Sequence, residues 1–161
     1  MTATAKLAGL GLQLPAVATP AGAYVPAVRS GSQVLTSGQL PMVDGALVAT
    51  GKVGAEVSQE QAYDAARIAA LNAVAAAAEV AGGLDAITRV VKVVVFVASD
   101  PAFTAQAQVA NGASELLGEL FDGGHVRSAV GVAVLPLGTP VEVELVVEAP
   151  GPVQEPKVFP A

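Results

Sequence analysis

The sequence of 161 residues contains no cysteine and no tryptophan, and it has a single histidine, His125. Without cysteine the chain can form no disulfide, no thiolate zinc site and no cysteine nucleophile. One histidine cannot build a histidine-rich metal site, and no carboxylates have the spacing of metal ligands, so we expect no metal. We interpret His125 as a loop or strand-entry residue rather than a catalytic base. The lack of cysteine fits a cytoplasmic protein, and we expect that location.

Charge is also scarce, at 14% of residues with a net charge of −6. The eight Lys and Arg residues are scattered along the chain, so it lacks the basic stripe that usually marks nucleic-acid binding. An average soluble domain is roughly 25% charged. We therefore expect no nucleic-acid partner, and we ask what covers the surface of a protein with so few charges.

Long apolar runs are absent too, although 53% of the residues are hydrophobic. The most apolar long stretch, residues 65–81, is mostly alanine and is interrupted by Arg67, Asn72 and Glu79. A membrane-spanning helix needs about 20 strongly apolar residues. We therefore expect no membrane segment.

The length fits one domain that is large enough to bury a core. Residues 1–23 are rich in Ala, Gly and Pro without a sustained period, which predicts an N-terminal arm. Residues 24–149 form the single predicted domain. Residues 150–161 contain four prolines and are predicted to be an extended tail.

The first half of the domain predicts a hairpin and a long helix. Two β-rich runs flank the turn at residues 30–32, and one further edge strand is expected at residues 46–48. Ser58 and Gln61 form a capping box, so a helix is expected from about Gln59 to Ala81, where two glycines end it.

The second half predicts three strands and another helix. Residues 90–97 are β-branched and apolar on both faces, as in a central strand covered on both sides. A helix is expected to start at residues 99–101 and to run to about Phe121. Strands at residues 125–135 and 140–149 then surround a turn at residues 136–139. The order β-β-(β)-α-β-α-β-β predicts an α+β domain, a mixed sheet with two helices on one face.

Two charged residues are candidates for chemistry. Strand alternation aligns Arg127 with Ala129, Gly131 and Ala133, so its guanidinium faces open space. It is either a surface arginine or an anchor for a carboxylate, which its planar fork can bind bidentately. In the last strand, alternation alone explains Glu144 and Glu148, whereas Glu142, nearest the turn, is the candidate base or water-orienting group.

A register estimate separates these two candidates. If residues 136–139 form a hairpin turn, Glu142 pairs near Ala133, about six residues from Arg127 and so roughly 20 Å away. Arg127 and Glu142 could then share a site only if different subunits contribute them.

The sequence from about Tyr24 to Glu148 resembles the Rid family of reactive-intermediate (enamine/imine) deaminases, formerly the L-PSP endoribonuclease family. Several motifs carry the resemblance at consistent spacing: Thr36-Ser37-Gly38-Gln39-Leu40-Pro41, Val91-Lys92-Val93-Val94-Val95-Phe96-Val97, Val126-Arg127-Ser128-Ala129-Val130, and Leu135-Pro136 leading to Val141-Glu142-Val143-Glu144. The segments Val109–Ser114 and His125–Gly131 are similar to those of a less characterised subgroup.

The resemblance implies a chorismate-mutase-like fold and a homotrimer with clefts between subunits, without a cofactor. In the deaminases, the arginine that matches Arg127 grips the substrate carboxylate, and the glutamate that matches Glu142 orients the water that hydrolyses an imine. Substrate-binding positions of that cleft match Tyr24, Ser37, Gly38 and Asn111.

Three functions follow from the resemblance. The first is hydrolytic deamination of 2-imino or enamine acids, such as those derived from 2-aminoacrylate, to 2-keto acids and ammonia. The alternative is a non-catalytic trimer that binds a small carboxylate and acts through partners. An endoribonuclease fits less well with the acidic chain and its few aromatics. Ala129 stands where the better-known deaminases often carry Cys, and the segment from Asn111 to Arg127 is about one residue shorter, which bears on substrate preference.

Overall fold

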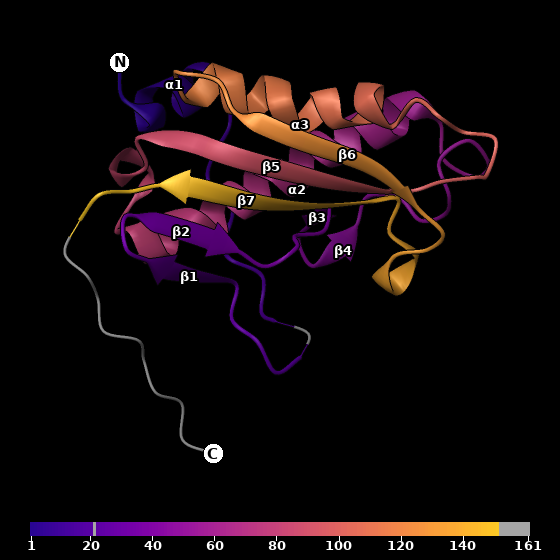
Figure 1. Ribbon diagram of the computed structural model, residues 1–161, viewed down its shortest axis with the longest axis horizontal. Coiled ribbons are helices and arrows are strands. Elements are labelled where there is room, and N and C mark those ends of the chain that lie inside the picture. The colour runs from indigo at the N-terminus through magenta and orange to yellow at the C-terminus, as the bar shows by residue number, and fades with distance from the viewer. Residues whose placement is uncertain (21, 152–161) are drawn as a thin grey trace.

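The computed structural model describes residues 1–20 and 22–151, which form one mixed sheet with helices on one of its faces (Figure 1). The main sheet has the strand order β1-β2-β7-β5-β6, and a small second sheet pairs β3 with β4. Strand β6 is parallel to β5, and the other neighbours in the main sheet are antiparallel. The strands are β1 (Ala27–Ser30), β2 (Gln33–Thr36), β3 (Met42–Val43), β4 (Ala46–Leu47), β5 (Arg89–Ala98), β6 (Val126–Val132) and β7 (Val141–Glu148). The predicted α+β class is confirmed.

Within residues 1–20 and 22–151, three α-helices and two short 3-10 helices complete the fold: α1 (Ala3–Gly9), α2 (Gln59–Ala81), α3 (Gln106–Leu120), η1 (Leu84–Ala86) and η2 (Pro136–Gly138). None of the helices in the described residues is long and apolar enough to cross a membrane.

The predicted hairpin and long helix are confirmed. Strands β1 and β2 pair up to Ser30 opposite Gln33, and Gly31 takes a positive φ of 60° in the two-residue turn. At the start of α2, the Ser58 hydroxyl accepts from the Gln61 N–H while the Gln61 side chain accepts from the Ser58 N–H. Gly82 ends the helix in the left-handed conformation.

Alanine allows α2 to lie close to the sheet and to α3. The buried residues of α2 are ten alanines and Val74. Where α3 meets α2, a side chain at Gly112 would overlap the backbone carbonyl of Tyr63, so only glycine permits this approach. The close packing fixes the rotation of α3 about its axis and therefore which of its side chains face the sheet.

Only one face of the main sheet is covered by helices. Val93, Val95, Val143 and Leu145 are fully buried beneath α2 and α3. The opposite face, called the open face below, carries the alternate residues, among them Val28, Leu35, Lys92, Val94, Phe96, Val126, Val130, Glu142, Glu144 and Val146. Strand β5 is central, as predicted, but the prediction that both of its faces are covered is wrong within the described chain.

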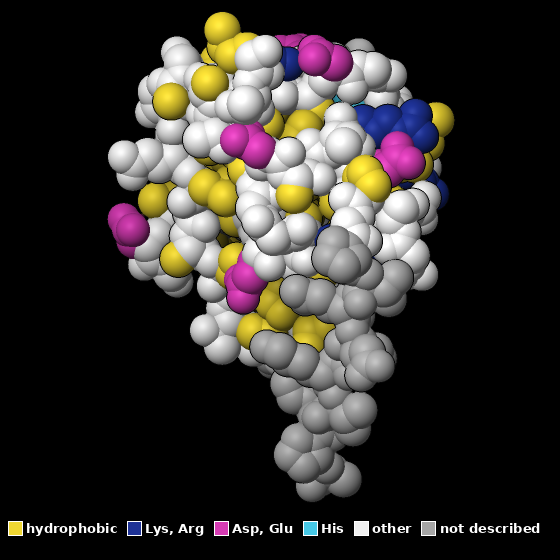
Figure 2. Space-filling view, turned by 90° about the vertical axis from the view of Figure 1, so that its left-hand side faces the viewer, with side chains coloured by type: hydrophobic (Ala, Val, Ile, Leu, Met, Phe, Trp, Pro, Cys, Tyr) yellow, Lys and Arg dark blue, Asp and Glu magenta, His cyan; other side chains and the backbone are white. Residues whose placement is uncertain are grey.

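Apolar residues remain exposed on the open face. Val28, Leu35, Val126 and Val130 are each at least 36% exposed. Figure 2, which shows another side of the molecule, also has few charged side chains among the uncharged ones, and its largest group of basic side chains lies beside an acidic one. The surface of the isolated chain is therefore largely uncharged, as the low content of charged residues in the sequence indicates.

The N-terminal segment is more ordered than the predicted arm. Residues Ala3–Gly9 form α1, in which Thr2 caps the first turn and accepts from the Ala5 N–H. Ala3 and Leu7 are buried in the main core. These two residues are four apart on one helix face, a pattern too short to be recognised as a period. The predicted tail lies mostly outside the described residues, which end at position 151.

The predicted start of the second helix is wrong. Helix α3 begins at Gln106, whereas the Asp100 carboxylate accepts from the Ala102 N–H and closes a turn. Ser, Asp and Pro favour both helix starts and turns, so the local sequence could not separate the two.

The last two strands do not form the predicted hairpin. Strand β5 lies between β6 and β7, pairing in parallel with β6 and antiparallel with β7. Helix α3 supplies the long connection that a parallel pair requires, and β7 pairs with the other edge of β5. The pairing of Glu142 near Ala133, which was inferred from the hairpin, is therefore also wrong.

Candidate functional site

Arg127 lies on β6 and points towards α3. Its Nη1 donates to Asn111 Oδ1 at 2.8 Å and to Ser114 Oγ at 3.1 Å. Both partners are neutral, and none of the ion pairs among residues 1–20 and 22–151 includes Arg127. The half-buried guanidinium therefore keeps a positive charge that no neighbouring carboxylate neutralises, which is the condition for binding an anion.

Asn111 and Ser114 reach Arg127 because they are three residues apart on one face of α3. Gly112, between them in the sequence, packs against the backbone of α2 and sets that face towards β6. Helix packing thus brings Asn111, one of the predicted substrate-binding residues, into contact with Arg127.

His125 extends this cluster. Its Nε2 lies 3.0 Å from Ser114 Oγ. Burial, with a smaller contribution from the positive charge of Arg127, lowers the pKa of His125 below its usual value. A neutral imidazole can accept the Ser114 hydroxyl hydrogen, which leaves the serine oxygen to accept from Arg127. His125 does enter a strand, as predicted, but it also supports the arginine site.

The small residues beside Arg127 do not all face open space. A side chain at Gly131 would approach the Gln106 Nε2 to 2.8 Å, and Ala129 packs against the core. The expectation that Ala129 and Gly131 leave a void in front of the guanidinium is therefore wrong at these positions. Their size lets α3 and the loop before it pack closely over β6.

Glu142 lies on the open face of β7 against the backbone of Gly38. A Cβ atom at Gly38 would overlap the Glu142 carboxyl group. Burial, with a smaller contribution from Glu144, raises the pKa of Glu142 above its usual value. A carboxylate with a raised pKa binds a proton more readily, which suits a group that takes a proton from water.

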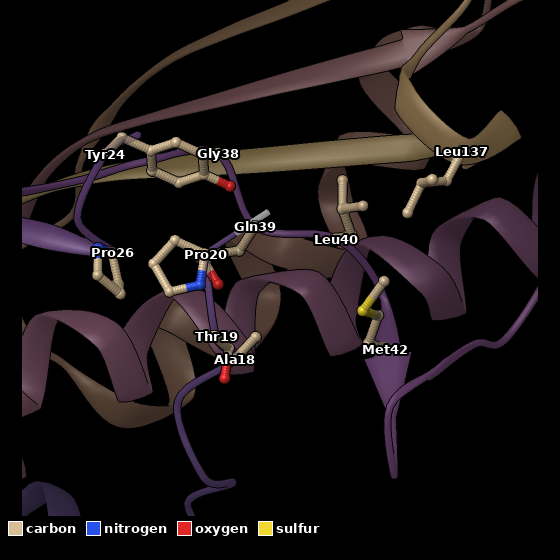
Figure 3. A pocket seen from close by; sticks show the side chains of 10 residues that line it. All are labelled: Ala18, Thr19, Pro20, Tyr24, Pro26, Gly38, Gln39, Leu40, Met42 and Leu137. Atoms are coloured by element: carbon tan, nitrogen blue, oxygen red, sulfur yellow. The ribbon is translucent and has the colours of Figure 1, made fainter. Parts of the chain in front are cut away.

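Ser37 and Tyr24 lie on the segments that lead to Gly38. The Ser37 hydroxyl donates to the carbonyl of Val25 at 2.6 Å, and the Ser37 N–H donates to Pro26 at 2.8 Å. Ser37 therefore ties the start of β1 to the end of β2 next to Tyr24. Tyr24 and Gly38 both line a cavity of about 80 Å³ (Figure 3).

The predicted site residues thus form two groups. One comprises Asn111, on α3, and Arg127, which faces that helix from β6, and the other comprises Tyr24, Ser37, Gly38 and Glu142. Arg127 pairs with Val93 and Glu142 with Phe96, so three residues of β5 and two strand spacings, each roughly 10 Å, separate them. They also point to opposite faces of the sheet.

Sequence reasoning missed the roles of Ser114 and His125. The spacing of Ser114 from Asn111 places both on one helix face, and His125 lies two residues before Arg127, on the same side of the strand. The helical spacing of Asn111 and Ser114 and the strand alternation of His125 and Arg127 were the signals from which both roles could have been predicted. No cluster of three potential metal ligands was found in the described part of the chain.

Comparisons with known proteins identify the fold and the family. The family described as "YjgF/chorismate mutase-like, putative endoribonuclease" matches residues 4–149, which include all of α1 except its first residue. The Trypanosoma cruzi protein TCP17 is 48% identical over 147 residues, which cover 89% of this chain and 92% of that protein.

Two solved structures are also similar. An endoribonuclease-like protein of Shewanella oneidensis is 34% identical with a TM-score of 0.88, over 92% of this chain and 99% of that one. Escherichia coli TdcF, crystallised with bound serine, is 27% identical with a TM-score of 0.61, over 84% of this chain and 93% of that one. The chain therefore belongs to the YjgF/L-PSP (Rid) family and has its α+β fold.

Proposed function

We propose that the protein hydrolyses 2-imino and enamine acids to 2-keto acids and ammonia. The observation that carries the proposal is the Arg127 guanidinium, which Asn111 and Ser114 hold in place while no described carboxylate neutralises it. An α-carboxylate matches such a group in charge and shape. The serine bound to TdcF, a relative, also carries an α-carboxylate.

The reaction needs little beyond orientation and one proton carrier. Water adds to the electrophilic C=N carbon while Glu142 takes a proton from it, and the proton then passes to nitrogen. The hydroxyl group of the resulting amino alcohol then gives its proton through Glu142 to the nitrogen, the C–N bond breaks, ammonia leaves and a C=O bond forms. Holding water and imine together in this way can lower the barrier by several kcal/mol.

We propose that the site is completed between subunits of a homotrimer. Arg127 and Glu142 lie on opposite faces of one sheet, so one chain does not bring them to the same substrate. The exposed valines of the open face are a surface that a second copy would cover. A ring of three copies repeats one heterologous contact three times and so completes three equivalent sites.

A second candidate function is carboxylate binding without turnover. The Arg127 group lies apart from Glu142, so it could bind a small acid without the proposed proton carrier. RNA cleavage, which the description of the family names, has less support. The chain has a net charge of −6, and His125 is held neutral beside Arg127.

The test couples the protein to an amino-acid oxidase that releases 2-imino acids and follows their loss with and without the protein. Faster loss, abolished by Arg127→Ala, supports the deaminase. A matched control is Arg67→Ala, because Arg67 makes an ion pair with Glu119 on the helical side. Thermal stabilisation by a 2-oxo acid without faster imine loss would support the binding protein instead.

A further inference from the structure

The Arg127 guanidinium uses only one of its nitrogens to hold its place in the protein. Nη1 donates to Asn111 Oδ1 at 2.8 Å and to Ser114 Oγ at 3.1 Å. Across residues 1–20 and 22–151, Nε and Nη2 have no hydrogen-bond partner. These two nitrogens form one side of the planar fork, which suits the two oxygens of a carboxylate. The site therefore keeps a bidentate edge for an anion.

His125 is linked to this guanidinium through one side chain of α3, the helix that runs along β6 (Figure 1). Ser114 Oγ is 3.0 Å from His125 Nε2 and 3.1 Å from Arg127 Nη1. Since a guanidinium can only donate, the serine oxygen accepts from Arg127. The direction of the bond between Ser114 and His125 is then set by the protonation state of the imidazole.

The two protonation states of His125 treat an anion differently. A neutral imidazole accepts the hydroxyl hydrogen of Ser114 at Nε2, which leaves the serine no hydrogen for a ligand. An imidazolium carries hydrogen on both ring nitrogens, so Nε2 donates to the serine oxygen and the hydroxyl hydrogen is free for a bound anion. The imidazolium also adds a second positive charge beside Arg127. An anion therefore binds better to the protonated state.

The neutral state is favoured while the site is empty. Burial, with a smaller contribution from the charge of Arg127, lowers the pKa of His125. Lys92 on β5 is level with Val126 and so points to the open face. Other charged groups on the neighbouring elements are paired: Glu115 with Tyr63, Glu119 with Arg67, Asp122 with Lys6 and Arg89 with Glu148. Arg127 is thus the charge whose neutralisation His125 would sense.

We propose that a carboxylate bound at Arg127 is taken up together with a proton on His125, which makes His125 a positioning residue of this site through Ser114. The inference rests on the proposed function and adds a means of regulating the same site. A bound carboxylate offsets the repulsion between Arg127 and the imidazolium, and it accepts the hydroxyl hydrogen of Ser114. By linkage, protonation of His125 must in turn strengthen carboxylate binding.

The first experiment measures binding of pyruvate to the intact protein by calorimetry between pH 5.5 and pH 8, a range in which pyruvate stays ionised. We expect the affinity to be at least about fivefold tighter at pH 5.5 than at pH 8. Titrations in buffers with different enthalpies of ionisation count the protons that are taken up on binding. We expect net uptake near the usual pKa range of histidine and none at pH 8. Methyl pyruvate, the uncharged ester, should show neither effect.

The second experiment follows His125 directly. Because the sequence has a single histidine, its imidazole gives one proton NMR signal that needs no assignment. Saturating pyruvate should raise the pH at which this signal titrates, and methyl pyruvate should leave it unchanged. This readout uses the unmodified protein, so it does not depend on the folding of any variant.

Variants locate the coupling. His125→Asn should bind pyruvate without proton uptake, with less than about a twofold difference in affinity between the two pH values. Ser114→Ala should lose more affinity at pH 5.5 than at pH 8, because the hydroxyl is available to a ligand only beside an imidazolium. Glu142→Gln should keep the coupling, which excludes Glu142 as the group that takes up the proton. Asp122→Asn is the matched control and should also keep it, since Asp122 is three residues before His125 but bonds to Lys6.

Pyruvate binding with no proton uptake and an unmoved His125 signal would overturn the inference and leave the proposed function standing. Proton-coupled binding in a protein that does not hydrolyse imines would support the inference and reject the proposed catalysis. An absence of pyruvate binding at every pH would overturn the inference together with the carboxylate site on which it rests.

Discussion

Arg127 and Glu142 flank the same strand, β5, but point to opposite faces of the sheet. Arg127 is level with Val93 and bonds to α3, whereas Glu142 is level with Phe96 and lies against Gly38 on the open face. A substrate that needs both must therefore touch two chains. This relationship makes the assembly part of the proposed chemistry.

Two replacements of Arg127 should distinguish the contribution of its charge to substrate binding from that of its planar shape. Arg127→Lys keeps the charge but loses the planar fork, so we expect KM for a 2-imino acid to rise about 100-fold, the range of a lost charged hydrogen bond. Arg127→Ala should remove measurable hydrolysis without changing the oligomeric state. Steady-state kinetics and size-exclusion chromatography check both, and unchanged kinetics in the alanine variant would remove Arg127 from the mechanism.

Glu142→Gln should lower the catalytic activity and raise the stability of the protein. The loss of the proton carrier should lower kcat by about 100-fold or more. Since burial raises the pKa of Glu142 in the folded protein, the ionised carboxylate costs stability once the pH rises above its unfolded value near 4.5. The glutamine variant should therefore melt at a higher temperature than the unmodified protein at pH 7 and lose this advantage below pH 4.5.

Glu144→Gln is the companion variant, because Glu144 also raises the pKa of Glu142. It should shift the acidic limb of the kcat profile to lower pH and retain most of the activity. An acidic limb that does not move, with Glu142→Gln still active, would argue against Glu142 as the proton carrier.

His125 should affect carboxylate binding and the pH dependence of stability. Its pKa is lowered on folding, so its contribution to stability is present above the unfolded value near 6.5 and is lost as the pH falls through the folded pKa. His125→Asn should flatten the stability curve below pH 6.5. Ser114→Ala, which breaks the link to Arg127, should raise KM about tenfold with little change in kcat. Thermal melts across pH and a KM-against-kcat comparison test the pair.

Gly38→Ala tests the close contact with Glu142. The new methyl group overlaps the carboxyl group, so Glu142 must move and activity should fall at least about tenfold. Gly118→Ala is the control, because Gly118 lies in α3 with nothing near the added atom. This control should keep full activity and gain about 0.5–1 kcal/mol of stability. Equal activity in both variants would contradict the assigned position of Glu142.

Local signals predicted the parts of the fold whose causes are local. The capping box at Ser58, the Gly82 stop and a hairpin turn around Gly31 each depend on a few neighbouring residues, and all are confirmed. The end of the sheet was misread because β6 and β7 are adjacent in sequence but separated in space by β5. That order depends on the crossover through α3, which no short motif encodes.

The candidate site also has parts that the sequence predicted and parts that it did not. Motif resemblance led to Arg127, Asn111 and Gly38, and the structure places each in one of two groups. The open face became visible only once the strand register was known.

The most direct test of the shared site mixes two inactive variants. Arg127→Ala and Glu142→Gln chains are unfolded together, refolded as one pool, and assayed for imine hydrolysis beside each variant refolded alone. In a randomly mixed cyclic trimer, about one quarter of the interfaces would combine an intact Arg127 with an intact Glu142, so about one quarter of the unmodified activity should return. Mixed trimers, verified by mass spectrometry, that show no recovery would contradict a site built from two chains.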